Sequence, residues 1–268
     1  MAATELASVD GRISATTAAT IPLPDDGLYR GDGVFEVIRL YGGRPFALRE
    51  HLDRLERSAA AIELSVERSL IEGELAALLA ESGNGDAQLR IVLTRGGRRI
   101  LLVERLPQRG PSVRLATVTY SPTVILTGVK SLSYAANMQA TRIAVRRGAD
   151  EALLVRPDGI VLEAPTSTIF WVSPDGGLRT PSLGAGILES ITRAQIVRSL
   201  HVEEGEFPAD DLLGALEAFL ASTVREVQPV AAIDGHELET GDRTLEARAA
   251  LDRALEEALG APQPTARA

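Results

Sequence analysis

Residues 31–55 read GDGVFEVIRLYGGRPFALREHLDRL, and this stretch decides the fold. Residues 34–40 and 44–48 are rich in apolar side chains, and the Tyr-Gly-Gly between them predicts a tight turn, so the two segments are expected to pair as a β-hairpin. Apolar residues then recur at helical spacing through residues 50–64, which predicts a helix directly after the hairpin. Strands and a helix in one short stretch indicate a mixed α+β fold.

Further segments extend this pattern to residue 105. They are a predicted helix at 69–81 and predicted strands at 89–95 and 100–105, the strands being joined by Gly96-Gly97. Residues 106–111, LPQRGP, then interrupt the pattern with two prolines and a glycine, which is typical of a connection between domains. We therefore expect a small N-terminal α/β domain over residues 1–107 and a larger domain over residues 112–268.

The second domain is expected to combine short strands with helices. Predicted strands lie at 113–120, 151–155, 160–163, 168–172, 218–223 and 227–234, and predicted helices lie at 135–148, from about residue 191, and at 245–259. Residues 261–268, APQPTARA, are expected to be disordered because they offer almost no apolar surface to bury.

The composition excludes several classes of protein. The chain has 268 residues, 37 of them acidic and 28 basic, and its net charge of −9 predicts no broad surface for nucleic acid or an anionic membrane. Cysteine is absent, which excludes thiolate sites, and the three scattered histidines predict no metal site. Because neither a signal-like N-terminus nor a long unbroken apolar run is present, no membrane association is expected and the cytoplasm is the default location.

Lys130 is the only lysine among the 28 basic residues. The simpler interpretation is a solvated lysine that survived a compositional drift towards arginine. Arginine cannot, however, replace lysine where an unprotonated amine has to attack a carbonyl group, because the guanidinium stays charged. Lys130 is therefore a candidate for covalent binding of a carbonyl compound.

Lys130 and two other features match the three chemical groups of pyridoxal 5′-phosphate. Its aldehyde requires a lysine, its pyridine nitrogen a carboxylate, and its phosphate a set of backbone amides and hydroxyls. Glu163 ends the predicted strand 160–163, where a carboxylate is costly unless a neighbour needs its charge, although an exposed acid is the alternative. Residues 184–193 lead through two glycines into a helix whose first amides can bind a phosphate, although many loops enter helices in this way.

Six motifs follow one another along the chain. They are GDGVFEVIRLYGGRPFALREHLDRL (31–55), LTRG (93–96), VKSLSYAANMQATRIAVRRGADEALLV (129–155), DGIVLEAPTSTIFWV (158–172), GILESITR (186–193) and FLASTVREVQPV (219–230). In this order and spacing they resemble the class IV aminotransferases, which are pyridoxal-phosphate enzymes of fold type IV. The family includes branched-chain aminotransferases, D-amino acid aminotransferases and 4-amino-4-deoxychorismate lyase. The resemblance implies a small N-terminal α/β domain and a larger, β-barrel-like C-terminal domain that binds the cofactor.

The resemblance also implies roles for individual residues. Lys130 would hold the cofactor as a Schiff base and move the proton at the substrate α-carbon, and Glu163 would face the pyridine nitrogen. The other cofactor ligands that the resemblance implies are Arg54, Ile191, Thr192, Thr223 and, shifted by one residue, Tyr134. From its place on the predicted helix alone, Arg54 is expected to be solvated, because it lies away from the apolar stripe.

A second group of residues matches the substrate pocket of the family. The residues that the resemblance assigns to the substrate are Phe35, Val37, Arg39, Arg98, Thr166 and Ser167. Either Arg98 or Arg99 matches an arginine that binds the substrate carboxylate in the D-amino acid branch, although two adjacent arginines on a turn are as often solvated. The loop after Glu163 departs from the family pattern, Glu-Gly-x-x-x-Asn, since the chain has Ala164 and Thr168 at the glycine and asparagine positions.

The activity that the resemblance implies is transfer of an amino group from an amino acid, of branched-chain or D type, to a 2-oxo acid in a ping-pong mechanism. Two other activities stay open, those of a 4-amino-4-deoxychorismate lyase and of an (R)-amine transaminase. A non-catalytic binding protein is the alternative of another class, but such a protein would have no reason to keep its single lysine at this position. Relatives are homodimers, which implies a homodimer here.

Overall fold

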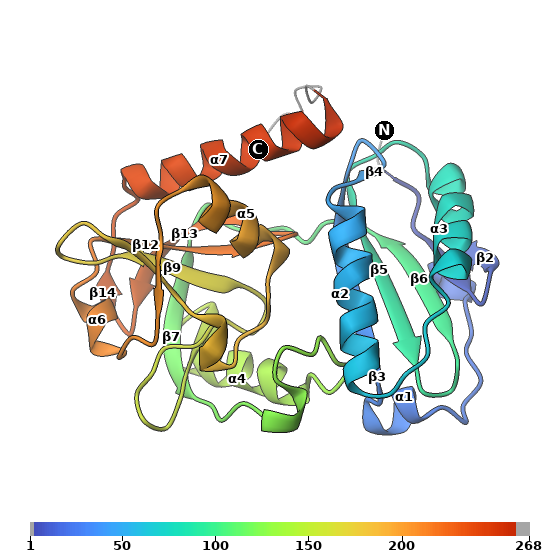
Figure 1. Ribbon diagram of the computed structural model, residues 1–268, viewed down its shortest axis with the longest axis horizontal. Coiled ribbons are helices and arrows are strands. Elements are labelled where there is room, and N and C mark those ends of the chain that lie inside the picture. The colour runs from blue at the N-terminus through green and yellow to red at the C-terminus, as the bar shows by residue number, and fades with distance from the viewer. Residues whose placement is uncertain (1–2, 261–268) are drawn as a thin grey trace. The chain divides into compact units, whose positions relative to one another are not determined.

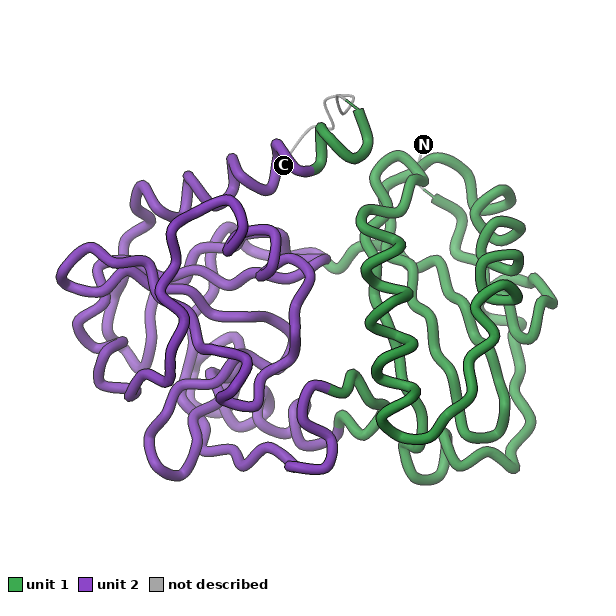
Figure 2. The backbone as a smooth tube through the Cα atoms, in the orientation of Figure 1, with its two compact units in different colours: residues 1–107, 129–134, 255–268 green, residues 108–128, 135–254 purple. Residues whose placement is uncertain are grey.

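The computed structural model describes residues 3–260, and it has the mixed α+β fold that the sequence predicts. The chain forms two compact units, which Figure 2 shows in different colours. Unit 1 comprises residues 1–107, 129–134 and 255–268, and unit 2 comprises residues 108–128 and 135–254. The segment that contains Lys130 therefore belongs to the first unit, although it follows the first strand of the second unit along the chain.

Unit 1 contains an antiparallel sheet of six strands in the order β2-β1-β6-β5-β3-β4. The strands are β1 (Leu6–Val9), β2 (Arg12–Ala15), β3 (Gly33–Tyr41), β4 (Arg44–Pro45), β5 (Ala87–Thr94) and β6 (Arg99–Glu104). The predicted hairpin is confirmed, because β3 and β4 pair with Tyr41 opposite Arg44. Gly42 and Gly43 have φ values of 55° and 77°, which the tight turn between these strands requires and which favour glycine.

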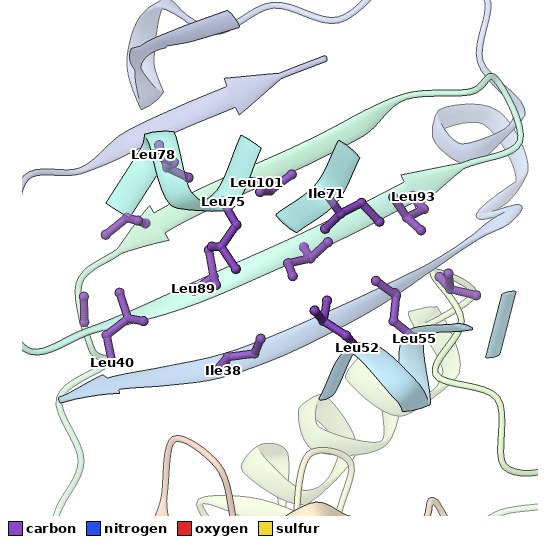
Figure 3. Close-up of a cluster of buried hydrophobic side chains, with 14 of the residues drawn as sticks. Ile38, Leu40, Leu52, Leu55, Ile71, Leu75, Leu78, Leu89, Leu93 and Leu101 are labelled. Atoms are coloured by element: carbon purple, nitrogen blue, oxygen red, sulfur yellow. The ribbon is translucent and has the colours of Figure 1, made fainter. Parts of the chain in front are cut away.

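Two helices, α2 (Leu48–Ala61) and α3 (Arg68–Ser82), cover one face of this sheet with apolar side chains. Alternate residues of β3, from Val34 to Leu40, point to that face. Figure 3 shows the side chains that meet there, which include Ile38, Leu52, Leu55, Ile71, Leu75, Leu89 and Leu101. Each of these fully buried side chains stabilises the fold by about 1.5–3 kcal/mol. The remaining residues of β3, among them Phe35, point to the opposite face.

Unit 2 contains an eight-stranded sheet in the order β11-β10-β9-β12-β13-β7-β8, with β14 paired to β13. The strands are β7 (Val113–Thr119), β8 (Glu151–Val155), β9 (Thr168–Val172), β10 (Leu178–Pro181), β11 (Glu203–Gly205), β12 (Glu217–Ser222), β13 (Glu226–Ile233) and β14 (His236–Glu237). This sheet is curled, which confirms the barrel-like architecture that the resemblance implies (Figure 1).

The remaining helices complete the two units. They are α1 (Asp26–Arg30) in unit 1, α4 (Ala135–Arg146), α5 (Ile191–Ser199) and α6 (Asp210–Leu213) in unit 2, and α7 (Asp242–Leu259) at the end of the described chain. The core of unit 2 contains one cluster around Trp171 and Leu220 and another in which Ala144 of α4 packs near Leu154. Within residues 3–260, none of the helices combines the length and hydrophobicity that a bilayer span requires.

Two predicted strands are wrong in part. Residues 44–48 form a strand only as far as Pro45, because Ala47 adopts a left-handed conformation with φ 53° and the chain enters α2 at Leu48. Residues 160–163 form only isolated bridges. The amide of Val161 donates to Phe207 while that of Leu162 donates to Leu154, so this segment divides its hydrogen bonds between two neighbours.

Several short elements are absent from the predictions. The strands β1, β2, β10 and β11 have four residues or fewer, and such lengths carry too little periodicity to be recognised. The predicted disorder of residues 261–268 lies outside the described residues.

Candidate functional site

Lys130 lies in an extended segment that pairs with the start of β3. Its carbonyl accepts a hydrogen bond from the Phe35 amide at 3.0 Å, and its own amide donates to Oγ of Ser58 on α2 at 3.2 Å. The next residue, Ser131, forms a β-bridge with Val34. The backbone of Lys130 is therefore held by a strand and a helix of the same unit.

The side chain of Lys130 extends towards two aromatic rings. Its Nζ lies 4.4 Å from the ring centroid of Phe35 and 6.0 Å from that of Tyr134, and the two rings meet edge to face at 5.5 Å. An ammonium group is attracted to the face of an aromatic ring, so these rings limit the directions that the side chain takes. Lys130 is half-buried.

Glu36, His51 and Arg54 form a buried cluster on the side of β3 that α2 covers. Arg54 donates from Nε to Oε1 of Glu36 at 2.6 Å and from Nη2 to Oε2 at 2.7 Å, and Nδ1 of His51 lies 2.8 Å from the same Oε2. The prediction that Arg54 is solvated is therefore wrong. Glu36 occupies a position of β3 that faces α2, and His51 and Arg54 are one helical turn apart, so both side chains reach it.

The cluster keeps the carboxylate of Glu36 ionised. Burial by itself raises the pKa of Glu36, but the charge of Arg54 and the hydrogen bonds from Arg54 and His51 outweigh burial and bring the pKa to about 2. Burial lowers the pKa of His51, and the hydrogen bond and charge of Glu36 do not fully offset that effect. Arg54 thus has a permanent anionic partner inside unit 1.

In unit 2, Glu163 faces the loop that leads into α5. Its Oε1 accepts a hydrogen bond from the amide of Leu188 at 3.1 Å, and its backbone carbonyl accepts one from Leu154 at 2.9 Å. Burial and the negative charge of Glu163 raise the pKa of Tyr120, so this phenol stays protonated near neutral pH. The half-buried carboxylate is therefore connected to the entrance of α5 by a direct hydrogen bond.

The first turn of α5 has the features of an anion site. Ser190 caps the helix, since its Oγ accepts a hydrogen bond from the Arg193 amide at 3.2 Å. The amides of Ile191 and Thr192 follow the cap and have no acceptor within the helix. Thr192 is buried, with 4% of its surface exposed. These amides, the Thr192 hydroxyl and the helix dipole favour a negatively charged group.

The substrate residues assigned in unit 1 lie on or beside the same sheet. Phe35, Val37 and Arg39 alternate with the core residues of β3, and the guanidinium of Arg39 lies 4.9 Å above the ring of Tyr41. Arg98 donates to Asp10 at 2.6 Å, and its neighbour Arg99 pairs with Glu74 at 2.7 Å. Both arginines therefore have acidic partners within unit 1.

The substrate residues assigned in unit 2 lie close to a buried arginine. Oγ1 of Thr166 donates to Glu151 at 3.2 Å, and Oγ of Ser167 accepts a hydrogen bond from Nε of Arg225 at 3.0 Å. Thr223 lies in the turn between β12 and β13, two residues before Arg225. The structure thus brings the 164–167 loop and the 222–226 turn to one side chain.

Four of these residues are absent from the sequence predictions, namely Glu36, His51, Glu151 and Arg225. A signal exists for Glu36, which is an acid at a core-facing position of an otherwise apolar strand and therefore needs a buried partner. No comparable signal marks Arg225, because its partners Glu151 and Ser167 lie 74 and 58 residues away in the sequence.

Comparison with known proteins gives a consistent result. Residues 33–233 match the family model of amino-transferase class IV. The chain is 30% identical to a D-alanine aminotransferase of Bacillus licheniformis, over 87% of this chain and 89% of that protein. It is 33% identical to a putative branched-chain-amino-acid aminotransferase of Methanocaldococcus jannaschii, over 85% and 87%. The solved fold IV transaminase of Curtobacterium pusillum superposes with a TM-score of 0.81 at 30% identity and covers 91% of this chain and 96% of that one.

Proposed function

This chain belongs to the class IV aminotransferase family, and on that premise we propose that it transfers an amino group from an amino acid to a 2-oxo acid, with Lys130 holding pyridoxal 5′-phosphate. The observation that carries the proposal is the position of the single lysine. Its backbone is held by Phe35 and Ser58, and its amine lies beside two aromatic rings. A lysine kept only for surface charge would need neither constraint.

The residues present fit the cofactor by their chemistry. Pyridoxal 5′-phosphate supplies an aldehyde that binds an amine and a protonated ring that draws electrons from the carbon attached to that amine. Lys130 provides the amine, and no other lysine of the chain can replace it. Glu163 provides a half-buried carboxylate suited to a protonated ring nitrogen. The start of α5 provides backbone amides and the Thr192 hydroxyl for a phosphate.

Each of these residues has a separate task in the proposal. Lys130 would hold the cofactor covalently and, as a free amine, would move the proton between the substrate α-carbon and the cofactor carbon. Glu163 would place its carboxylate at the ring nitrogen and keep that nitrogen protonated. The amides of Ile191 and Thr192, with the hydroxyl of Thr223, bind the phosphate at α5 and at the turn after β12. Arg54 is the other phosphate ligand that the resemblance implies.

Glu36 controls the contribution of Arg54 in this proposal. Both Nε and Nη2 of Arg54 are engaged by Glu36, which fixes the plane of the guanidinium. A fixed guanidinium binds an anion with less loss of side-chain entropy than a mobile one. Its positive charge is partly offset by Glu36.

The proposed substrate class is a small amino acid, either of D type or with a branched side chain. Two features support an amino acid over a plain amine. The family includes the D-alanine and branched-chain relatives found above, and the residues assigned to the substrate include Arg39, whose guanidinium suits a carboxylate. The handedness of the substrate is left to experiment.

Covalent trapping tests the role of Lys130. The protein is incubated with pyridoxal 5′-phosphate, reduced with borohydride, digested and analysed by mass spectrometry. We expect the label on the peptide that contains Lys130, and no label on that peptide in the Lys130→Arg variant, which keeps the positive charge. A label confined to the N-terminal amine of the unmodified protein would contradict the proposal.

A half-reaction panel tests the substrate class. The loaded protein is mixed separately with D-alanine, L-leucine, an (R)-amine and 4-amino-4-deoxychorismate, and the loss of the cofactor's yellow absorbance is recorded. Bleaching by D-alanine or L-leucine supports the proposal and identifies the branch. Bleaching by the (R)-amine alone, or breakdown of the chorismate derivative without bleaching by either amino acid, would replace it with one of the two alternative activities.

We propose that the protein works as a homodimer, as the family resemblance implies, and that its location is the cytoplasm. Light scattering on the purified protein tests the dimer, and a mass of one chain at micromolar concentration would contradict it. Cell fractionation tests the location.

A further inference from the structure

Arg225 is the centre of a buried polar cluster in unit 2. The Arg225 cluster is defined here by its four members, Arg225, Glu151, Ser167 and Gln228. The guanidinium donates from Nε to Oγ of Ser167 at 3.0 Å, from Nη1 to Oε1 of Gln228 and from Nη2 to Oε2 of Glu151. Only 2% of the Arg225 side chain and 10% of the Glu151 side chain are exposed.

The cluster connects segments that are far apart in the sequence. Glu151 is the first residue of β8, and its second oxygen accepts a hydrogen bond from Thr166 at 3.2 Å. Gln228 lies on β13, and its Nε2 donates to the carbonyl of Gly110 at 2.7 Å. One guanidinium therefore ties the 164–167 loop to two strands and, through Gln228, to the segment that precedes β7.

Arg225 also belongs to the turn that carries Thr223. Its amide donates to Oγ of Ser222 at 3.4 Å, and the following residue, Glu226, has φ 57°. A residue other than glycine adopts this left-handed conformation only where its surroundings hold it. The 222–226 turn thus contains the residue whose side chain holds the 164–167 loop.

We infer that Arg225 is a positioning residue that sets the spacing between the 164–167 loop and the 222–226 turn and thereby determines substrate affinity. This inference rests on the proposed function, in which Thr223 contacts the cofactor phosphate, and on the family resemblance, which assigns Thr166 and Ser167 to the substrate. Arg225 itself neither accepts nor donates the transferred proton. Its contribution is the same before and during the chemical step, so its loss raises KM and leaves kcat nearly unchanged.

The Arg225→Met variant is the first test. Methionine keeps an unbranched chain but removes every side-chain donor, while the backbone amide that donates to Ser222 stays. We expect KM for the amino acid to rise by about 10- to 100-fold, the effect expected when one hydrogen-bonded contact that binds substrate and transition state equally is lost. We expect kcat to change by less than about threefold. Arg248→Met is the matched control. Arg248 donates to the carbonyl of Val227 on β13, but to neither the 164–167 loop nor the 222–226 turn.

Hydrogen–deuterium exchange distinguishes an effect of Arg225 on the 164–167 loop and the 222–226 turn from a general loss of rigidity in unit 2. In Arg225→Met, the amides of both the 164–167 loop and the 222–226 turn should exchange faster, while β9 and α7 keep the protection of the unmodified protein. Faster exchange in only one of the two segments, an unchanged KM, or a fall in kcat alone would overturn the inference.

A second variant covers the case in which Arg225→Met does not fold. Arg225→Met combined with Glu151→Leu removes both buried charges, and such pairs are often replaced by apolar residues without loss of the fold. The same kinetic and exchange results are expected. If the unmodified protein transfers no amino group from any donor, the proposed function fails, but the exchange pattern still decides whether Arg225 holds both segments.

Discussion

Arg54 and Glu36 form a doubly hydrogen-bonded ion pair inside unit 1, with Nε 2.6 Å from Oε1 and Nη2 2.7 Å from Oε2. The side chain of Glu36 is fully buried and that of Arg54 is 6% exposed. In this environment a charge that loses its partner is strongly destabilising, because it can neither be solvated nor paired. The stability of unit 1 therefore depends on the hydrogen bonds that hold Arg54 and Glu36 together.

Glu36→Gln removes the negative charge and keeps the shape of the side chain. We expect the free energy of unfolding to fall by about 3–5 kcal/mol, because Arg54 stays buried without a counter-charge. Urea titration measures this change. Glu104→Gln is the control, since Glu104 pairs with Arg90 where both side chains are about one-third exposed, and it should cost no more than about 1 kcal/mol. A loss below about 1 kcal/mol for Glu36→Gln would show that the pair contributes little.

The lowered pKa of Glu36 also predicts that the protein loses stability in acid. Its pKa is about 2 in the folded protein and 4.5 ordinarily, so the unfolded chain takes up a proton first as the pH falls. The stabilisation is therefore fully present above pH 4.5 and is lost between pH 4.5 and about 2. The lost free energy is on the order of 3 kcal/mol. Urea unfolding at a series of pH values measures it, and the same series on Glu36→Gln should lack this part of the pH dependence.

The lowered pKa of His51 predicts a second change of stability with pH, close to neutral pH. Burial lowers its pKa below the ordinary 6.5, so below pH 6.5 the unfolded chain binds a proton that the folded chain does not. Stability should therefore fall as the pH drops from 6.5 towards the lowered pKa, by up to about 1.4 kcal/mol per pH unit. In His51→Asn the amide can still donate to Glu36, but this slope should disappear. His201→Asn, at an exposed histidine, is the control variant. If the pH dependence of stability persists in His51→Asn, another group causes it.

Gly33 predicts a close approach beside Lys130. A Cβ added there would lie 2.3 Å from the carbonyl oxygen of Leu93 and 2.7 Å from Cδ1 of Leu132, which is in the segment that holds Lys130. Gly33→Ala should destabilise the protein by about 1–3 kcal/mol, as overpacking does. Gly73→Ala is the matched control, because Gly73 lies within α3 with open space around it, and it should stabilise by about 0.5–1 kcal/mol. Thermal unfolding measures both, and equal changes in the two variants would contradict the close contact.

Glu163→Gln tests the role of the carboxylate without removing the acceptor of the Leu188 hydrogen bond. We expect transamination to slow by about 100- to 1000-fold, the range seen when one preorganised electrostatic contact is lost. Stopped-flow half-reactions with a single amino acid measure the rate. Glu189→Gln is the control variant. Glu189 is exposed and follows Leu188 in the loop before α5, so this variant should react at the normal rate. A Glu163→Gln variant with undiminished turnover would show that the charge of Glu163 is not used.

The elements with strong periodicity were predictable from the sequence. The β3–β4 hairpin, α2, α3 and α4 occur within a few residues of the expected positions, because their apolar spacing is set by which face each element buries. Residues 160–163 were not predictable in the same way. Their apolar pattern is that of a strand. In the folded chain, however, the amide of Val161 donates to Phe207, and that of Leu162 donates to Leu154 of the sheet. The sequence does not show that Phe207 lies beside this segment.

The sequence by itself predicted which residue holds the cofactor, because the single lysine is the only side chain of the chain able to form an imine with an aldehyde. It also determined the family, through motifs whose order and spacing are read directly. The tertiary structure alone decided the surroundings of those residues. Arg54 is buried against Glu36 and not solvated, and Arg225 joins Glu151 across 74 residues of chain. Such partners depend on distances in space, since a buried charge is stabilised by whatever the fold brings within hydrogen-bonding range and not by its neighbours in the sequence.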